Sequence, residues 1–229
     1  REFREKGYLP EALVNFLLLL GWHPSTDQEL FALEEAAKVF SIERISTSPV
    51  SFSLDKLDWY NGLYIRKLSP EDLAKRCVPF LQKDGLLPDP CPREQLTYLT
   101  KIIPLVQERI KLLSEISKAV SYFLKEEISP PAKEVLIIKK GTAEETAAIL
   151  KKIVETFSKL EDFSEETIEK SLRDVTEALG EKPGRVFMPV RISVTGETAT
   201  PGLFELLAAL GKPRVIHRLQ QAIAVLEYA

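Results

Sequence analysis

The sequence predicts an all-α fold. Apolar residues recur at steps of three and four along much of its 229 residues, which is the spacing of a helix face that packs on a core. No stretch shows the sustained alternation of apolar and polar residues that indicates a half-buried strand. Serine, threonine, proline and glycine stand between the apolar segments, as residues that begin and end helices. We therefore expect helices joined by loops.

The composition is that of an ordinary soluble protein. With 45% apolar residues the chain can bury substantial cores. Its longest apolar run, residues 16–22, is far shorter than the roughly 20 residues of a membrane span. Cys77, Cys91, His23 and His217 are the only cysteines and histidines, and they lack the spacing of metal ligands. We expect a cytoplasmic protein with free thiols, no metal and no membrane contact.

The charge is nearly balanced, because 31 basic and 34 acidic side chains give a net charge of −3. A dedicated nucleic-acid domain is often strongly basic. An RNA contact would therefore depend on a few placed arginines, since phosphate contacts set affinity and base-edge contacts set specificity. The nearly neutral net charge slightly favours a protein-interaction function over RNA binding. In that alternative the chain is an all-α module that docks a protein partner and touches no RNA.

The first part of the chain is expected to form helices from its start. Pro10 begins a helix that runs through Leu20 and is buried on most sides. Thr26 or Asp27 caps a second helix over residues 28–40.

An extended, turn-rich connection over residues 45–54 is expected to lead into a helix over residues 55–66. Asn61 and Gly62 within that helix mark a bend or the close approach of another backbone.

The middle of the chain has a clear helix start. Ser69 is a capping residue, Pro70 stands in the first turn, and Asp72 follows three residues after the cap. A further helix is expected over residues 93–103, where Pro104 disturbs the hydrogen bonding.

An amphipathic helix is expected after Pro104, over residues 105–124. Arg109 lies near the start of this helix, where a cation is unfavourable because a helix N-terminus carries a partial positive charge. We infer that something outside the helix stabilises Arg109.

A boundary is expected at residues 128–131, where two prolines rule out a continuous helix. Thr142 and Glu145 then form a capping box, and Ser164 caps the following helix, which ends at Gly180.

The stretch after Arg191 is expected to hold a helix end and a helix start. One helix ends at Gly196, and Thr200 and Pro201 begin the next, with the hydroxyl at the N-cap. Arg191 lies one turn before the helix end and can reach the same place. The first backbone N–H groups of a helix lack intrahelical partners, and here they belong to Thr200, Gly202 and Leu203. The alternative is ordinary helix punctuation beside a solvated arginine.

Lys212 and Pro213 begin the last helix. Its Arg214, His217 and Arg218 are expected to form one basic face opposite an apolar face. This basic face either contacts an RNA backbone or is solvated.

Two segments of the chain resemble bacterial-type glutamyl-tRNA synthetases. The run P-V-R-x-x-x-T-G-x-x-x-T-P-G-L-F-E-L-L-A-A-L-G-K, residues 189–212, is similar to their last domain. The runs G-Y-L-P-E-A-L-V-N-F-L-L-L-L-G-W, residues 7–22, and S-x-S-P-V-S-F-S-L-D-K-L-D-W-Y-N-G-L-Y-I-R, residues 46–66, are similar to the region after the catalytic domain's lysine-rich loop. The segments occur in the same order as in that family.

The resemblance implies an elongated helical arm. Residues 1–68 correspond to part of a stem-contact domain, and residues 69–128 and 129–229 to two small anticodon-binding subdomains. In that family such an arm grips the anticodon stem-loop of glutamate-specific tRNA and positions the tRNA for ATP-dependent glutamylation.

The resemblance also implies the site residues. It assigns Arg109 to the third anticodon base, where arginine rather than glutamine goes with a preference for glutamate tRNA. A guanidinium can donate to cytosine O2 or to phosphate while it stacks on a base. The implied contacts to the first two anticodon bases are Arg191, Thr200, Pro201, Gly202 and Leu203. Candidate contacts to the tRNA backbone are Lys56, Arg66, Lys67, Arg214 and Arg218.

The ATP-binding signatures of the family's catalytic domain are missing, and so are glycine-rich phosphate loops. We therefore expect a monomeric C-terminal fragment of a class I glutamate–tRNA ligase. Such a fragment has no catalytic site and no cofactor of its own, because ATP and Mg²⁺ belong to the catalytic domain.

Overall fold

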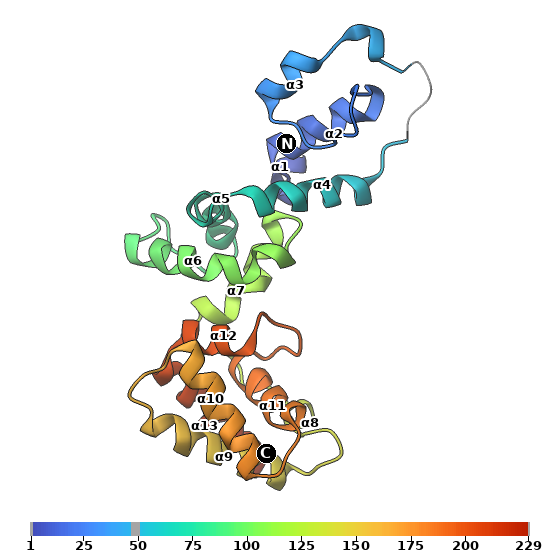
Figure 1. Cartoon of the computed structure of the whole chain (residues 1–229). Helices are drawn as coiled ribbons and strands as arrows, with labels where there is room; N and C mark the ends of the chain where they lie inside the picture. The colour runs from blue at the N-terminus through green and yellow to red at the C-terminus, as the bar shows by residue number, and fades with distance from the viewer. Residues whose placement is uncertain (1, 47–50, 229) are drawn as a thin grey trace. The chain divides into compact units, whose positions relative to one another are not determined.

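A computed structural model describes residues 2–46 and 51–228, and within those ranges it contains helices and no strand. The all-α fold is therefore confirmed. The chain forms two compact units, residues 1–119 and 120–229 (Figure 1). The three-part division at residues 68 and 128 stays a prediction. Part of the connection expected at 45–54, residues 47–50, lies outside the described residues.

Unit 1 contains most of the short elements. In chain order they are α1 (Glu2–Lys6), α2 (Pro10–Gly21), α3 (Leu33–Val39), the 3-10 helix η1 (Ile42–Arg44), α4 (Leu54–Lys67), α5 (Pro70–Lys83), α6 (Arg93–Val106), and the 3-10 helices η2 (Gln107–Arg109) and η3 (Leu113–Glu115). The helix α7 (Ile116–Leu124) follows η3 directly.

The core of unit 1 lies between α2 and α4, where Tyr8, Phe16, Leu57 and Tyr60 pack together. The predicted start of α5 is confirmed, because the Ser69 hydroxyl accepts a hydrogen bond from the backbone N–H at the third helical position, 3.2 Å away. Helix α4 therefore contacts α2, near the start of unit 1, and η2, near its end.

Helix α2 is covered on most sides but not on all. Val14 is 44% exposed and Leu17 is 50% exposed, so one strip of the helix is open although most of its circumference is covered. Leu13, Leu19 and Leu20 are partly buried against the cluster of Tyr8, Phe16, Leu57 and Tyr60, and Leu18 is partly buried against the cluster of Trp22, Phe31 and Ala36. Ala12, Asn15 and Phe16 are the buried residues of the helix.

The second helix begins five residues later than expected, at Leu33 instead of residue 28. The amide of Asn15 explains the difference, because it donates to the carbonyl of Glu29 at 2.8 Å and accepts from the N–H of Phe31 at 3.0 Å. Tyr64 also donates to the Phe31 carbonyl, at 2.7 Å. These side chains from α2 and α4 hold the segment extended.

The continuous helix expected over residues 105–124 is also wrong. Helix α6 runs through Pro104 and ends at Val106, and the chain then forms η2, an extended segment at 110–112, η3 and α7. The extended backbone is paired outside the helix, since the N–H of Leu113 donates to the carbonyl of Gly7 at 3.0 Å.

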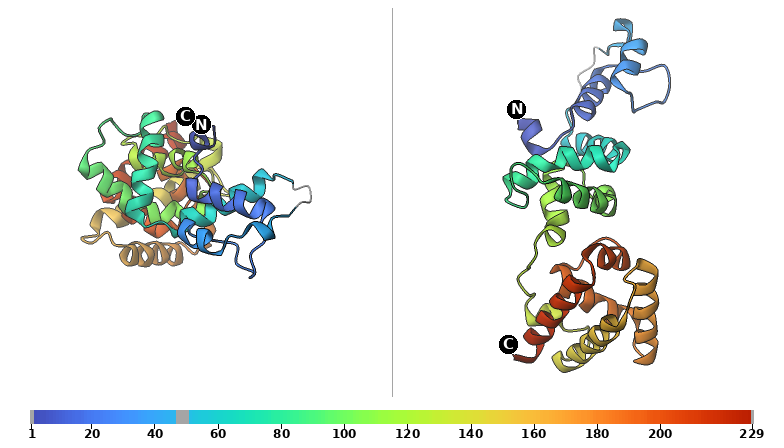
Figure 2. Two further views of the ribbon diagram at one scale, coloured as in Figure 1. Left: turned by 90° about the horizontal axis from the view of Figure 1, so that it is seen from above. Right: turned by 90° about the vertical axis from the view of Figure 1, so that its left-hand side faces the viewer.

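Unit 2 is a helical bundle. It contains the end of α7, followed by α8 (Lys133–Leu136), α9 (Ala143–Lys159), α10 (Glu165–Ala178), α11 (Pro183–Thr195), α12 (Leu203–Leu210) and α13 (Lys212–Tyr228). Helices α9 and α13 pack side by side, and α11 packs on both (Figure 2). The buried residues at their centre include Ile153, Phe157, Val215, Leu219 and Ala222.

Most predicted helix ends of unit 2 are confirmed. The capping box of Thr142 and Glu145 is formed, with hydrogen bonds of 3.1 and 3.2 Å. Gly180 and Gly196 have φ values of 65° and 77° and follow the ends of α10 and α11. Ser164 precedes α10 as expected, but its hydroxyl bonds the side chains of Asp162 and Thr167 in place of a backbone cap.

Candidate nucleic-acid interface

Arg109 is the last residue of η2, directly after the C-terminal end of α6. It is therefore not near a helix N-terminus, and the electrostatic mismatch inferred from the sequence does not exist, because a cation is favourable at a helix C-terminus. The side chain is exposed and makes no hydrogen bond or ion pair to another described residue. Its donors are available to a ligand.

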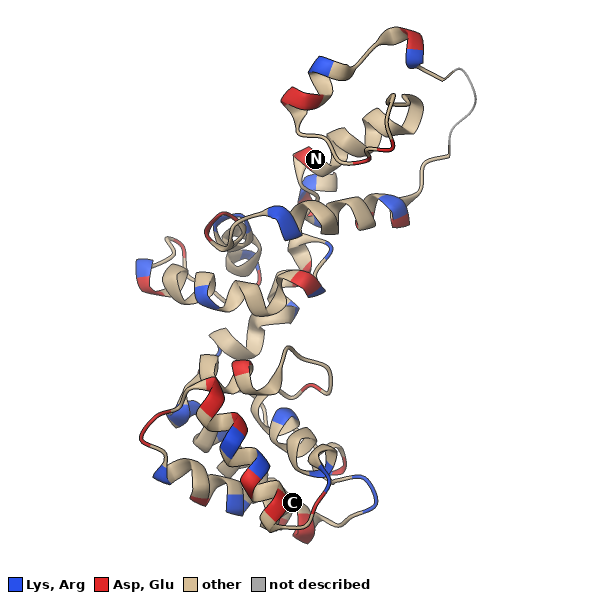
Figure 3. Cartoon of the chain, in the orientation of Figure 1, with Lys and Arg blue, Asp and Glu red and all other residues tan. Residues whose placement is uncertain are grey.

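Further basic residues surround the end of α4, close to η2. The Arg66 guanidinium lies 3.7 Å from the carboxylate of Glu108 in η2. A side chain at Gly62 would lie 3.3 Å from Arg66 and 3.5 Å from the stem of Lys111, so both basic side chains cover this glycine. Figure 3 shows Lys and Arg at this end of α4. Lys111 was not predicted, because nothing in its local sequence separates it from a solvated lysine.

The candidate backbone contacts on α4 do not form one group. Lys56 is exposed in the first turn of α4, with its ammonium 5.8 Å from the ring of Tyr60. Arg66 and Lys67 lie in the last turn, ten or more residues further along, which corresponds to about 15 Å of helix. Lys67 is exposed beside the ring of Tyr64.

In unit 2 the structure brings Arg191 together with the T-P-G turn. Its Nη1 donates to the hydroxyl of Thr200 and, at 2.7 Å, to the carbonyl of Pro201. The expectation that Arg191 reaches this turn is confirmed. The arginine fixes the turn from inside, since its side chain is half-buried and Thr200 is 8% exposed.

The helix after this turn begins later than expected. Helix α12 starts at Leu203 with Gly202 as its N-cap, so Thr200 is not the capping residue. Thr200 lies two residues before the N-cap, and its hydroxyl accepts from Arg191. Pro201 and Leu203 are buried, whereas Gly202 and residues 196–199 are exposed. The surface of this site is therefore made by loop backbone and by the N-terminal end of α12.

The basic face expected on α13 is wrong in one residue. Arg218 is 1% exposed and donates to the carbonyls of Tyr122, Val194 and Lys125, at 2.9, 2.6 and 2.7 Å. A guanidinium has five donors in a fixed plane, which suits three carbonyl acceptors, here two from the end of α7 and one from α11. Arg214 is half-buried and donates to the carbonyl of Phe123 at 2.7 Å. Arg218 therefore has a structural role in unit 2 and does not offer a phosphate contact.

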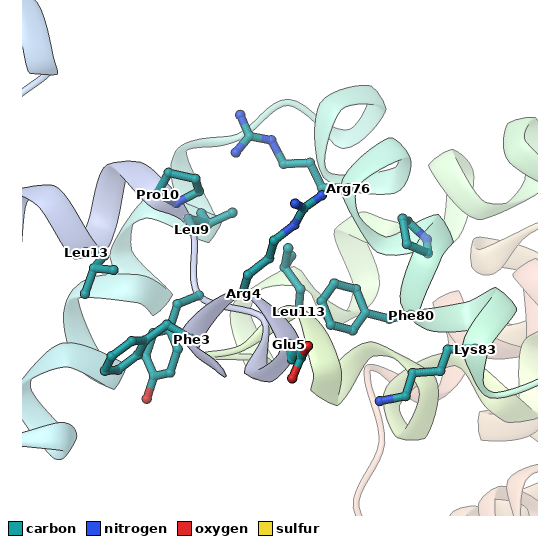
Figure 4. Close-up of a pocket in the computed structure, with 12 residues that line it drawn as sticks. Phe3, Arg4, Glu5, Leu9, Pro10, Leu13, Arg76, Phe80, Lys83 and Leu113 are labelled. Atoms are coloured by element: carbon teal, nitrogen blue, oxygen red, sulfur yellow. The ribbon is translucent and has the colours of Figure 1, made fainter. Parts of the chain in front are cut away.

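A cavity of about 860 Å³ in unit 1 contains none of the predicted site residues (Figure 4). It lies between α1, the start of α2 and α5, and Phe3, Leu13 and Phe80 line it together with Arg4 and Arg76. Arg76 is ion-paired with Glu11 and Asp72, and the hydrogen bond to Glu11 raises the pKa of its guanidinium. Its charge is thus already balanced within unit 1.

The described residues contain no group of three or more His, Cys, Asp and Glu side chains that could hold a metal ion. They also contain no helix with the length and apolar character of a membrane span.

Comparisons with known proteins identify two parts of the chain. Residues 72–223 match the family model of the anticodon binding domain, and residues 1–59 match that of the catalytic domain of class I tRNA synthetases for E and Q. The first match includes Arg109 and the whole Arg191 turn. Residues 60–71 lie between the two matches.

Curated relatives are glutamate–tRNA ligases. The chain is 40% identical to glutamate–tRNA ligase 1 of Caldanaerobacter subterraneus subsp. tengcongensis over 99% of its own length and 46% of that protein. It is 37% identical to the enzyme of Moorella thermoacetica, over 96% and 45%. The chain thus spans somewhat less than half the length of these relatives.

A solved structure has the same fold. The crystal structure of a glutamate tRNA ligase from Elizabethkingia meningosepticum, in complex with its amino acid, superposes with a TM-score of 0.86 at 29% identity, over 98% of this chain and 43% of that one. Together with the anticodon-binding match over most of the sequence, this similarity shows that the chain belongs to the glutamyl-tRNA synthetase family and includes its anticodon-binding domain.

Proposed function

We propose that this chain binds the anticodon stem-loop of glutamate-specific tRNA and places the tRNA for glutamylation by a glutamate–tRNA ligase. The observation that supports this most is the anticodon-binding match over residues 72–223, because it includes both arginines that the sequence singled out. In this proposal Arg109 contacts the third anticodon base, and the turn held by Arg191 contacts the first two.

The geometry supports different roles for the two arginines. Arg109 is exposed and has no partner among the described residues, so it can donate directly to a base edge. Arg191 donates to Thr200 and Pro201, so it fixes the shape of the turn. The exposed Gly202 lies at the N-cap of α12, where backbone N–H groups lack intrahelical acceptors and suit an electron-rich base edge.

Backbone contacts to the tRNA are proposed for Lys56, Arg66, Lys67 and Arg214, with Lys111 added on the structure. Arg218 is removed from the proposal because it is buried. Activation of glutamate would need ATP and Mg²⁺ in the catalytic domain. We further propose that the protein is cytoplasmic and monomeric.

The test is RNA binding by the 229-residue chain, measured as fluorescence anisotropy of a labelled stem-loop with a glutamate anticodon. Arg109→Ala should raise Kd about 5- to 150-fold, the range for an arginine that reads a base. Arg109→Lys keeps the charge but loses the planar fork, so it should relax the preference for the third base while the salt dependence stays the same. Arg191→Ala should relax the preference for the first two bases.

Arg93→Ala is the matched control for Arg109→Ala, because Arg93 is an exposed arginine that also lies in unit 1, at the start of α6. It should leave the anticodon preference unchanged. Wild-type affinity and wild-type anticodon preference in both Arg109→Ala and Arg191→Ala would contradict the proposal.

A protein-docking role is the second candidate, and the exposed apolar side chains of α2, α3 and η1 favour it. Around α2 and α3, Val14, Leu17, Leu33 and Ile42 are 44, 50, 62 and 73% exposed. Salt separates the two functions, since RNA binding weakens steeply with salt through counterion release and an apolar interface does not.

A further inference from the structure

We infer that Gln107 is a positioning residue for Arg109, acting with Asn61 to hold the segment 107–113 on helix α4. This inference rests on the proposed function of Arg109. It extends that function by naming the side chains that place the base-reading guanidinium.

Gln107 fixes the segment on its N-terminal side. Its Nε2 donates to the carbonyl of Ile65 at 2.8 Å and to the carbonyl of Leu68 at 2.9 Å. The Ile65 carbonyl lies in the last turn of α4, where it also accepts from the N–H of Leu68 at 3.1 Å, and Leu68 is the C-cap residue of that helix. One amide therefore attaches η2 to the C-terminal end of α4.

Asn61 fixes the segment on its C-terminal side. It is fully buried within α4, and its Nδ2 donates to the carbonyl of Lys111 at 2.5 Å, while its Oδ1 accepts from the N–H of Leu9 at 2.8 Å. The same Nδ2 lies 3.4 Å from the carbonyl of Gly7, which in turn accepts from the N–H of Leu113. The Asn-Gly pair indicates a bend or the close approach of another backbone, and this contact is such an approach; α4 continues through it without a break.

Arg109 lies between these two attachments. The buried side chain of Ile110 follows it, and the carboxylate of Glu115 accepts from the N–H groups of Lys111 and Leu112 at 2.7 and 3.2 Å. The backbone on either side of Arg109 is thus fixed although it is not helical. A fixed backbone reduces the entropy that a flexible loop would lose when its arginine binds a base, so the two amides favour binding at this position.

A simple capping role for Gln107 makes a different prediction. If the amide served only the end of α4, its loss would lower stability and weaken binding equally for every anticodon. If it positions Arg109, its loss changes the preference for the third base and leaves the preference for the first base unaltered.

The test is Gln107→Met, which keeps the length of the side chain and removes both donors. Gln107 is half-buried, so this variant should fold, whereas a change at the fully buried Asn61 risks the fold of unit 1. Gln82→Met is the matched control, because the amide of Gln82 also donates to a backbone carbonyl of unit 1, that of Pro88, at 2.9 Å.

Two quantities are measured on the 229-residue chain. The first is third-base discrimination, the ratio of Kd for a stem-loop with a substituted third anticodon base to Kd for the unsubstituted one. Gln107→Met should lower it roughly three- to tenfold, the effect of losing one or two hydrogen bonds. The second is hydrogen exchange of residues 108–112 without RNA, which should become faster in Gln107→Met and stay unchanged in Gln82→Met.

The outcomes separate this inference from the proposed function. If Arg109→Ala lowers third-base discrimination but Gln107→Met does not, the positioning role is wrong and the function stands. Equal loss at the first and third bases in Gln107→Met, or unchanged exchange at 108–112, also overturns the positioning role. If Arg109→Ala has no effect on discrimination, the proposed function of Arg109 fails, and the inference fails with it.

Discussion

The buried Arg218 should be among the most costly positions to change in unit 2. Its guanidinium joins two segments, through the carbonyls of Tyr122 and Lys125 at the end of α7 and through the carbonyl of Val194 in the last turn of α11. Methionine at this position fills most of the volume and offers no donor. The substitution therefore isolates the hydrogen bonds from the packing.

The magnitude follows from these contacts. A hydrogen bond from a charged donor contributes about 1.5–3 kcal/mol, and a buried acceptor left without a donor costs about 1–3 kcal/mol. The burial of the cation offsets part of this sum, because desolvating a charge is unfavourable. We expect Arg218→Met to lower the free energy of unfolding by about 3–5 kcal/mol, and the melting temperature by more than about 10 °C.

Denaturant unfolding followed by circular dichroism measures this effect. Arg218→Lys should lose most of the same free energy, since an ammonium cannot reach three carbonyls in the plane of a guanidinium. Arg214→Met is the control, because Arg214 is half-buried and donates to one carbonyl, that of Phe123, so it should lose about 1 kcal/mol. A loss below about 1 kcal/mol in Arg218→Met would show that the three hydrogen bonds do not stabilise unit 2.

Two further predictions concern unit 1. Gly7 has a φ of 90°, and a Cβ there would lie 2.5 Å from the backbone N of Ser114, so Gly7→Ala should lower the free energy of unfolding by about 2–4 kcal/mol. Gly21 has open space around it, so Gly21→Ala should be neutral or should stabilise the chain by up to about 1 kcal/mol. Equal changes in the free energy of unfolding for the two variants would refute the steric argument. Burial raises the pKa of the Cys77 thiol to about 12, so iodoacetamide at pH 8 should alkylate only Cys91 in the folded chain and both cysteines in denaturant. Because the folded chain binds the Cys77 proton more tightly than the unfolded chain, the stability that this thiol contributes should decline as pH rises from 9 towards 12. Rapid alkylation of both thiols in the folded chain would contradict the burial of Cys77.

Local chemistry was enough to predict many helix ends. Ser69, Thr142 and Gly196 act through atoms within a few residues of themselves, by a hydroxyl that accepts a backbone N–H or by a left-handed φ. Such signals depend little on the rest of the fold. They therefore remain readable in one sequence without any knowledge of which segments meet.

Long-range hydrogen bonds explain why two of the predicted helices, those over residues 28–40 and 105–124, were wrong. Asn15 holds the backbone at residues 29–31 extended, and Asn61 does the same at Lys111 from a position 50 residues away. Both segments have helical spacing of apolar residues, so periodicity favours a helix in each. A buried asparagine with two backbone partners competes with helix formation, and its partners cannot be read from the sequence.

The arginines show why the candidate site could be predicted only in part. All three arginines carry the same charge. They differ in how many of their N–H donors already have acceptors within the fold. Arg218 is buried on three carbonyls, and Arg191 is half-buried and shapes a turn. Arg109 is exposed with no partner in the described part of the chain, and so it keeps all its donors for a ligand. In the proposed function, recognition of RNA by this chain of balanced charge depends on such unused donors. The net charge of −3 is therefore a weak argument against RNA binding.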